Sequence, residues 1–100
     1  MARSIEPQLN GKSTKQLYRV LASLSRPDEV AKFLRDLLTF EEIEESARRF
    51  EVAKLLTKEK TFREIAAKTK MSTATIARIN SWLHHGTGGY RLALRMLVPS

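Results

Sequence analysis

A run of small and hydroxyl side chains in the second half of the chain is suited to reading a nucleic-acid groove. The run comprises Ser72, Thr73, Ala74, Thr75, Ala77 and Arg78. Small and hydroxyl side chains allow a helix to approach base edges and thymine methyl groups closely, and an arginine can bind guanine with two hydrogen bonds. Three cations precede the run, Arg63, Lys68 and Lys70. Such side chains, together with the backbone N–H groups of a helix start at Ser72 and Thr73, predict contacts with phosphates.

Two short helices are needed to position these side chains. Thr61 followed by Glu64 has the spacing of a capping box, and Ser72 can cap a second helix. The helices would meet through apolar or small residues, namely Ile65, Ala66, Met71, Ile76 and Ile79. We therefore predict a helix-turn-helix over residues 61–83, with a tight turn near residues 69–71. The turn of such motifs usually holds a glycine, whereas Lys70 stands here, and a lysine at positive φ costs about 1 kcal/mol.

The charge and composition of the chain also favour a nucleic acid as its partner. The 100-residue chain has a net charge of +7, and residues 61–100 hold six Lys/Arg against the single acid Glu64. A basic segment of this kind favours polyanions. The absence of cysteine excludes disulfides, thiolate metal sites and cysteine nucleophiles. With no apolar run long enough to cross a bilayer and a polar N-terminus, we expect a cytoplasmic, nucleoid-associated protein.

Helix signals recur along the rest of the chain and predict an all-α fold with six helices. Ser13 with Gln16 would open the first helix, to about residue 23, and Ser25 would cap a second that has Pro27 and Asp28 in its first turn. Thr39 with Glu42 would open a long third helix to about residue 58, and a short sixth would follow the glycines at 86, 88 and 89, to about residue 97. Apolar stripes support these helices, among them Val30, Phe33, Leu34, Leu37 and Leu38, and then Phe40, Ile43, Ala47, Phe50 and Ala53. We expect residues 1–11 to form a flexible tail and residues 12–98 one domain.

Other residues that could do chemistry have simpler interpretations. His84 and His85 are adjacent, so they point about 100° apart on a helix and are poorly placed to share a metal. The acids Glu41, Glu42, Glu44 and Glu45 suit the positive end of a helix dipole. Trp82 is expected in the core or at a subunit interface, with stacking on a base or a ligand as the alternative. Arg91 and Arg95 either contact phosphate or are solvated. We therefore expect no enzyme activity, no metal and no cofactor.

The order and spacing of several segments resemble the Trp repressor superfamily, and most of all its YerC/YecD family. These segments are LTFEE from residue 38, RRFEVAKLL from 48, TFREIA from 61, STATIAR from 72 and LHHGTGGY from 83. The resemblance covers residues 13–97. It implies a six-helix Trp repressor-like fold, an intertwined homodimer, and a bacterial transcriptional regulator whose fourth and fifth helices bind double-stranded DNA. A dimer also suits the small core of such a short chain and the symmetry of palindromic sites.

The resemblance also bears on a ligand. The Trp repressor holds tryptophan between two arginines, and the matching positions here are Arg49, with Arg48 as an alternative, and Arg78. The repressor has a glycine after the second arginine, whereas this chain has Ile79, whose bulk would fill the space beside the indole. We therefore expect a regulator, most simply a repressor, that does not respond to tryptophan. The alternative function is a helical adaptor module that binds another protein, and RNA binding is a lesser possibility.

Overall fold

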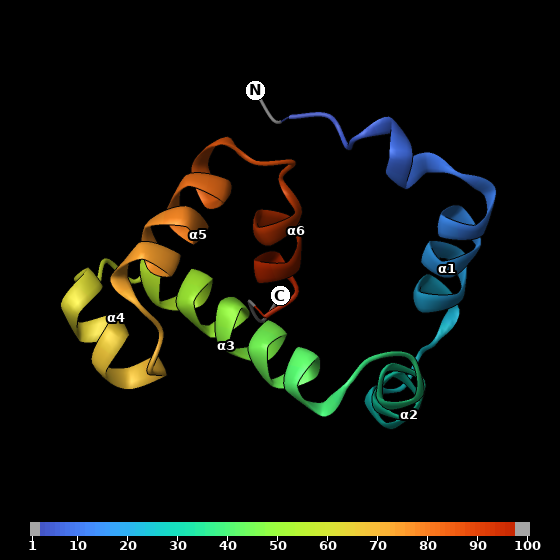
Figure 1. Cartoon of the computed structure of the whole chain (residues 1–100), viewed down its shortest axis with the longest axis horizontal. Helices are drawn as coiled ribbons and strands as arrows, with labels where there is room; N and C mark the ends of the chain where they lie inside the picture. Colours follow the sequence, from blue (N-terminus) through green and yellow to red (C-terminus); the bar gives the residue numbers. More distant parts are fainter. Residues whose placement is uncertain (1–2, 98–100) are drawn as a thin grey trace. The chain divides into compact units, whose positions relative to one another are not determined.

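The computed structural model describes residues 3–97, which form six α-helices and one short 3₁₀ helix, with no strand in that part of the chain (Figure 1). The elements are η1 (Pro7–Asn10), α1 (Lys12–Ser23), α2 (Pro27–Leu37), α3 (Phe40–Thr57), α4 (Phe62–Thr69), α5 (Thr73–His85) and α6 (Gly89–Arg95). The all-α prediction with six α-helices is confirmed. By their internal contacts the residues divide into two compact units, residues 4–44 and residues 45–97 with Arg3, and the boundary falls within α3.

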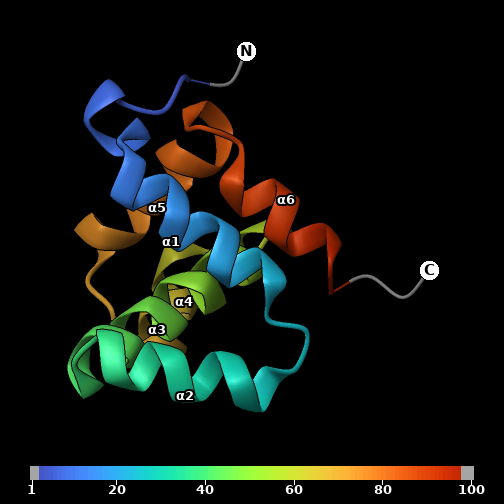
Figure 2. The same ribbon diagram turned by 90° about the vertical axis from the view of Figure 1, so that its right-hand side faces the viewer.

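The unit of residues 45–97 builds a hydrophobic core of its own. Its buried side chains come from the second half of α3, from α4 and from α5. Helices α4 and α5 contact each other directly, and the ribbons show both of them beside α3 (Figures 1 and 2). Tyr90 and Leu94 of α6 pack against this core from a third side. The core consists of Val52, Ala53, Leu55, Ile65, Ile76 and Ile79. Three of the residues predicted from the helix-turn-helix pattern are thus fully buried, and Ala66 and Met71 pack against them.

The long helix α3 buries a different set of residues from the predicted stripe. Ala53 is buried as expected, but Phe40 at the start of the helix is 55% exposed. The deepest positions include Val52 and Leu55, which the stripe omits. Residues of α4, α5 and α6 all pack around the second half of α3 in the core. This part of α3 is therefore buried on more than one side. A single stripe of constant spacing cannot describe such a helix.

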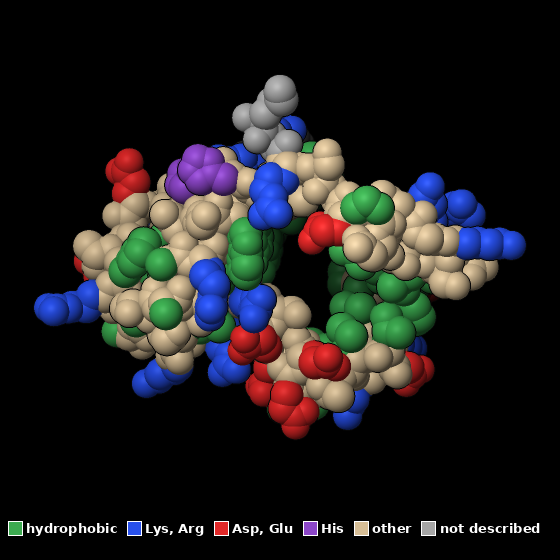
Figure 3. Space-filling model, turned by 45° about the horizontal axis from the view of Figure 1, so that its top comes forward, with side chains coloured by type: hydrophobic (Ala, Val, Ile, Leu, Met, Phe, Trp, Pro, Cys, Tyr) green, Lys and Arg blue, Asp and Glu red, His purple; other side chains and the backbone are tan. Residues whose placement is uncertain are grey.

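The residues of the unit 4–44 form helices without burying a side chain. None of the residues of η1, α1 or α2 is buried, although both α-helices are strongly amphipathic. Large apolar side chains of this unit are exposed, including Tyr18, Val20 and Leu37. Figure 3 shows hydrophobic side chains at the surface of the molecule. The Tyr18 hydroxyl donates to the carbonyl of Leu9 at 3.1 Å and so ties η1 to α1. The predicted tail thus contains a 3₁₀ helix, while residues 1 and 2 and the predicted domain end at residue 98 lie outside the described residues.

The helix starts show which capping predictions are right. Glu42 donates its N–H to the Thr39 hydroxyl at 3.1 Å and accepts from the Thr39 N–H at 2.8 Å, so the predicted box at α3 is confirmed. The caps at Ser13 and Ser25 are wrong, because the N-cap positions are Gly11 and Arg26, with no side-chain cap. The first helix starts earlier than expected and takes Ser13 into its first turn. In the second, Pro27 occupies the first helical position, which its fixed φ favours, and this leaves Ser25 one residue too early.

Candidate nucleic-acid interface

Helix α4 begins with a complete capping box. The Thr61 hydroxyl accepts from the Glu64 N–H at 3.1 Å, and the Glu64 carboxylate accepts from the Thr61 N–H at 3.3 Å. The helix buries Ile65 and keeps Arg63 and Lys68 exposed. Because Glu64 is engaged with the backbone, the acid closest in sequence to these two cations is already held in the helix start.

The turn between α4 and α5 has the backbone conformation that the sequence predicted. Lys70 has φ 64° and ψ 18°, in the left-handed region, and its N–H donates to the carbonyl of Ala66 at 2.9 Å. The preceding Thr69 is buried, and its hydroxyl donates to the carbonyl of Ile65 at 2.7 Å while accepting from the Met71 N–H at 3.4 Å. The buried hydroxyl satisfies backbone groups on both sides of the turn, which helps to offset the strain at Lys70. A second positive φ, at Glu59 before α4, was not anticipated.

Helix α5 starts with a small hydrogen-bonded network of side chains. The Ser72 hydroxyl caps the helix by accepting from the Thr75 N–H at 3.1 Å, which confirms the predicted cap. The Thr75 hydroxyl then accepts from the Ser72 hydroxyl at 3.0 Å and from the Arg78 guanidinium at 3.3 Å. Because these residues are three positions apart, they lie on one side of the helix. The network thus fixes the Arg78 guanidinium beside the Thr75 hydroxyl on that side of the helix.

The two faces of α5 are sharply different. Ile76 and Ile79 are fully buried and Leu83 is 4% exposed, so one face is fixed in the core. On the other face Thr73, Ala74, Ala77 and Arg78 are exposed and Thr75 is half-buried. Of the nine side chains singled out from the sequence, the remaining four, Arg63, Lys68, Lys70 and Ser72, are also exposed. The helix-turn-helix therefore presents small side chains on one face of α5, while the opposite face is packed in the core.

The two arginines implied as ligand residues have partners within the chain. Arg49 donates to the Glu45 carboxylate at 3.3 Å, Arg48 lies 3.6 Å from the same carboxylate, and Arg78 is engaged with Thr75. Ile79 is 0% exposed, so its side chain lines no open cavity. Burial raises the pKa of the nearby Tyr90 phenol, and the positive charge of Arg49 acts in the opposite direction.

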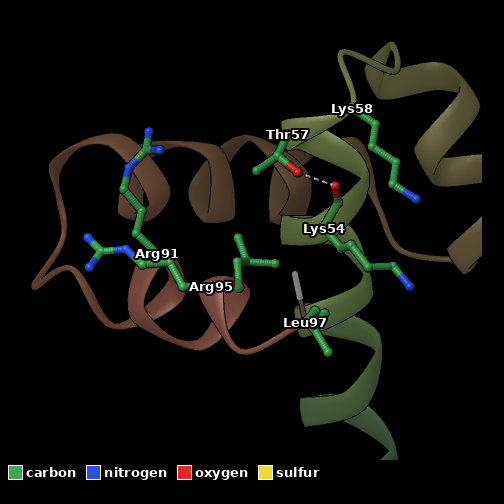
Figure 4. A pocket seen from close by; sticks show the side chains of 7 residues that line it. Lys54, Thr57, Lys58, Arg91, Arg95 and Leu97 are labelled. Atoms are coloured by element: carbon green, nitrogen blue, oxygen red, sulfur yellow. Dashed lines mark hydrogen bonds between the residues drawn. The ribbon is translucent and has the colours of Figure 1, made fainter. Parts of the chain in front are cut away.

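The unit of residues 45–97 has an open cavity between α3 and α6. It measures about 710 Å³ and has a mostly apolar wall (Figure 4). Its lining includes the cations Lys54, Lys58, Arg91 and Arg95. Lys54 is paired with the Glu51 carboxylate at 3.0 Å, and its carbonyl accepts from the Thr57 hydroxyl (Figure 4). This groove lies on α3 and α6, whereas the residues predicted to bind DNA lie on α4, the turn and α5.

Four side chains at the end of α5 and on α6 differ in how far the sequence anticipated their surroundings. Trp82 is 39% exposed in the single chain and is not part of its core. The two histidines form an exposed patch (Figure 3), and no cluster of metal-ligating side chains occurs among residues 3–97. Arg91 of α6 is exposed as expected, and its guanidinium also donates to the carbonyl of Leu83 on α5. No local pattern signals this bond, because it joins residues from two different helices.

These features define a helix-turn-helix protein whose second helix is exposed on one face. The family model described as Trp repressor protein matches residues 12–98. The uncharacterized protein YerC of Bacillus subtilis (strain 168) is 39% identical over 87 residues, which are 87% of this chain and 84% of YerC.

Solved structures agree with this match. A TrpR-like protein from Eubacterium eligens superposes with a TM-score of 0.86 at 38% identity, covering 95% of this chain and all of that one. A structure from Staphylococcus aureus gives 0.87 at 30% identity, covering 97% and 99%.

The chain belongs to the Trp repressor family, and the resemblance inferred from its sequence is confirmed. Membership of this family points to a DNA-binding regulator rather than an enzyme. Within residues 3–97, none of the helices has the length and apolar character needed to cross a membrane.

Proposed function

We propose that this chain is a sequence-specific regulator of transcription, most simply a repressor, that binds double-stranded DNA as a homodimer. The observation that carries the proposal is the contrast between the two faces of α5. Ile76, Ile79 and Leu83 fix one face in the core, and the opposite face presents small and hydroxyl side chains with Arg78. A helix of this kind can enter the major groove and keep a constant angle to the protein.

The contacts divide into two kinds in this proposal. Thr73, Ala74, Thr75, Ala77 and Arg78 face the bases. Phosphates are bound by Arg63, Lys68, Lys70 and the N–H groups at the helix start at Ser72 and Thr73. The basic surface makes affinity fall with salt, by roughly 10³-fold or more between low and moderate salt if six or more phosphates are neutralised.

A second copy of the chain supplies the missing partner for the apolar side chains of the 4–44 unit and of α6. Leu92 of α6 is 59% exposed, and Met96 and Leu97, which follow the helix, are 84% and 54% exposed. Several large apolar side chains exposed in a small chain mark an interaction surface. In the proposed dimer the helices α1 and α2 bury their apolar faces, and two copies of α5 read two half-sites of a palindrome. The domain that does so spans residues 12–98, with residues 1–11 as a tail.

The regulator acts without tryptophan and without a cofactor in this proposal. The side chain of Ile79 occupies the core beside α3, and Arg49 and Arg78 are engaged with Glu45 and Thr75. If calorimetry shows stereoselective binding of tryptophan at micromolar concentration, this part of the proposal is wrong. We place the protein in the bacterial cytoplasm, at the nucleoid.

The test compares two single variants on DNA. Duplexes are first selected from a random pool by the wild-type chain, and binding is then measured on selected and scrambled sequences. Arg78→Ala should lower the preference for the selected sequence by about 5- to 160-fold, because a base contact is worth about 1–3 kcal/mol. Lys68→Ala should weaken binding to both sequences alike. If both variants lose affinity uniformly, Arg78 does not read bases.

The second candidate function is a helical adaptor that binds another protein. The exposed apolar side chains of α1 and α2 favour it, since a protein partner could cover them as well as a second copy could. An adaptor would show no preference among DNA sequences in the selection experiment. The same experiment thus decides between the two functions.

A further inference from the structure

We propose that Arg91 is a positioning residue for α5, which it holds at the C-terminal end without touching DNA. This inference rests on the proposed function, in that α5 is the helix that enters the groove. The contacts behind this inference join residues of the unit 45–97 to each other, so they exist whether or not the chain binds DNA.

The Arg91 side chain reaches from α6 to the last turn of α5. Its Nε donates to the carbonyl of Leu83 at 3.1 Å, and its Nη2 lies 3.2 Å from Nδ1 of His84. The last carbonyls of a helix have no partner within the helix, and a cation near them is favoured by the helix dipole. A guanidinium presents several donors in a fixed plane, so Arg91 can contact two neighbouring residues of α5 at once.

The chain leaves α5 in a turn that closes tightly on the preceding carbonyl. The Gly86 N–H donates to the carbonyl of Trp82 at 2.8 Å, and a Cβ at Gly86 would stand only 2.4 Å from that oxygen. Gly86 in turn accepts from the Arg3 N–H at 2.8 Å. The carbonyls of Trp82 and Leu83 are thus both bound by residues that follow the helix.

The helix that carries Arg91 is itself anchored. Tyr90 and Leu94, on either side of Arg91 in the sequence, pack against the hydrophobic core. Arg91 therefore connects the end of α5 to a helix, α6, that is itself packed against the core. Ile76 and Ile79 are buried near the middle of α5 and Leu83 is buried near its end, and the Arg91 contact adds a polar restraint at that end.

A helix held at two points cannot tilt freely. The 13 residues of α5 make a rod of about 20 Å, so a tilt of about 5° around its middle moves its first residues by about 1 Å. Hydrogen bonds to bases tolerate only a few tenths of an ångström. Loss of the Arg91 contact therefore disturbs Thr73 and Ala74 at the far end, where the bases are read.

The alternative role for Arg91 is a direct contact with phosphate. The two roles differ in salt dependence, because each phosphate contact contributes about 0.9 to the slope of log affinity against log salt. A positioning residue leaves the slope unchanged and lowers the preference for the selected sequence. A phosphate contact lowers affinity for all sequences and reduces the slope.

The experiment uses the full chain with Arg91→Ala, Arg91→Lys and the control Arg95→Ala, which removes the same charge one turn further along α6. Binding to selected and scrambled duplexes is measured over a range of salt, at a temperature at which circular dichroism shows every variant folded. Arg91→Ala should reduce the preference for the selected duplex by 5- to 20-fold at unchanged slope. Arg91→Lys should not restore it, because an ammonium group cannot match the two contacts, and Arg95→Ala should keep the wild-type preference. A slope reduced by about one in Arg91→Ala, with equal loss on both duplexes, overturns the proposal.

A second readout separates this inference from the function on which it rests. Hydrogen exchange of the amides of residues 84–86 reports the last turn of α5 whether or not DNA is bound. Arg91→Ala should accelerate their exchange at least 5-fold over wild type, and Arg95→Ala should not. If the wild-type chain selects no DNA but amide exchange in Arg91→Ala accelerates, the proposed function is wrong and the positioning role of Arg91 is retained. If amide exchange in Arg91→Ala is unchanged, the positioning role of Arg91 is wrong.

Discussion

The two units of this chain use similar helices in different ways. Residues 45–97 bury six apolar side chains in one core, and α4 and α5 present their polar faces outward. Residues 4–44 form two amphipathic helices that bury no side chain. Amphipathicity alone thus does not tell whether a helix completes a core within its own chain or offers its apolar face to another molecule.

The largest expected effect tests whether residues 45–97 hold themselves together. Ile79→Ala should lower the free energy of unfolding by about 2–5 kcal/mol, because it leaves a cavity in a fully packed core. Urea denaturation followed by circular dichroism measures the change. The matched control is Ile5→Ala at a position 46% exposed, where the change should stay within about 0.5 kcal/mol. Equal effects at both positions would remove the contrast between the units.

The next effect tests whether a second copy covers the helices of residues 4–44. Phe40→Asp places a charge at a side chain that is 55% exposed in the single chain and apolar in type. If that side chain lies in the dimer interface, the dissociation constant should rise at least 10-fold, as burial of an unpaired charge is costly. Sedimentation equilibrium over a range of concentrations measures it. Ser13→Asp, at an exposed polar position of α1, is the control, and an unchanged dimer in Phe40→Asp would exclude this face.

A smaller effect concerns the strained turn within the self-supporting unit. Lys70→Gly should raise the free energy of unfolding by about 0.5–1 kcal/mol, because glycine adopts positive φ without steric cost. Lys68→Gly, inside α4, should lower it by about 1 kcal/mol. The two substitutions remove the same side chain two positions apart, so opposite signs isolate the backbone contribution. Thermal unfolding monitored by circular dichroism gives both values.

The smallest effect concerns the local stabilisation of α3 at its start. Hydrogen bonds from the Thr39 backbone and side chain lower the pKa of Glu42 below its ordinary 4.5. A lowered pKa means that this stabilisation is present above the unfolded-state value and is lost as the pH falls through the folded-state value. Wild type should therefore melt higher than Glu42→Gln at pH 6, and the difference should shrink toward pH 3. A difference that is constant with pH would mean that ionisation of Glu42 plays no part.

The sequence predicted those features that depend on neighbours along the chain. The boxes at Thr39 and Thr61, the cap at Ser72 and the positive φ at Lys70 follow from residue types three positions apart or from one turn. Ile65, Ile76 and Ile79 follow from the spacing of two short helices. The caps at Ser13 and Ser25 failed because a shift of one or two residues in a helix start changes which residue is the cap.

Features that depend on distant residues were not accessible in this way. The burial of Val52 and Leu55 depends on three helices meeting on α3. The bond from Arg91 to Leu83 joins two helices through a glycine turn, and no sequence spacing encodes it. Which side chains face DNA stays a prediction, because the structure shows their exposure and not their partner.

The distribution of side-chain caps has a consequence for the order of folding. Helices α3, α4 and α5 start with hydroxyl caps, whereas α1 and α2 start at residues without one. A cap lowers the cost of nucleating a helix, so the helices of the core can form transiently in an otherwise unfolded chain. Helices α1 and α2 have no such cap, although α2 has Pro27 at its first position and two acids in its first turn. We therefore expect α1 and α2 to become ordered only when their apolar faces find a surface to pack against.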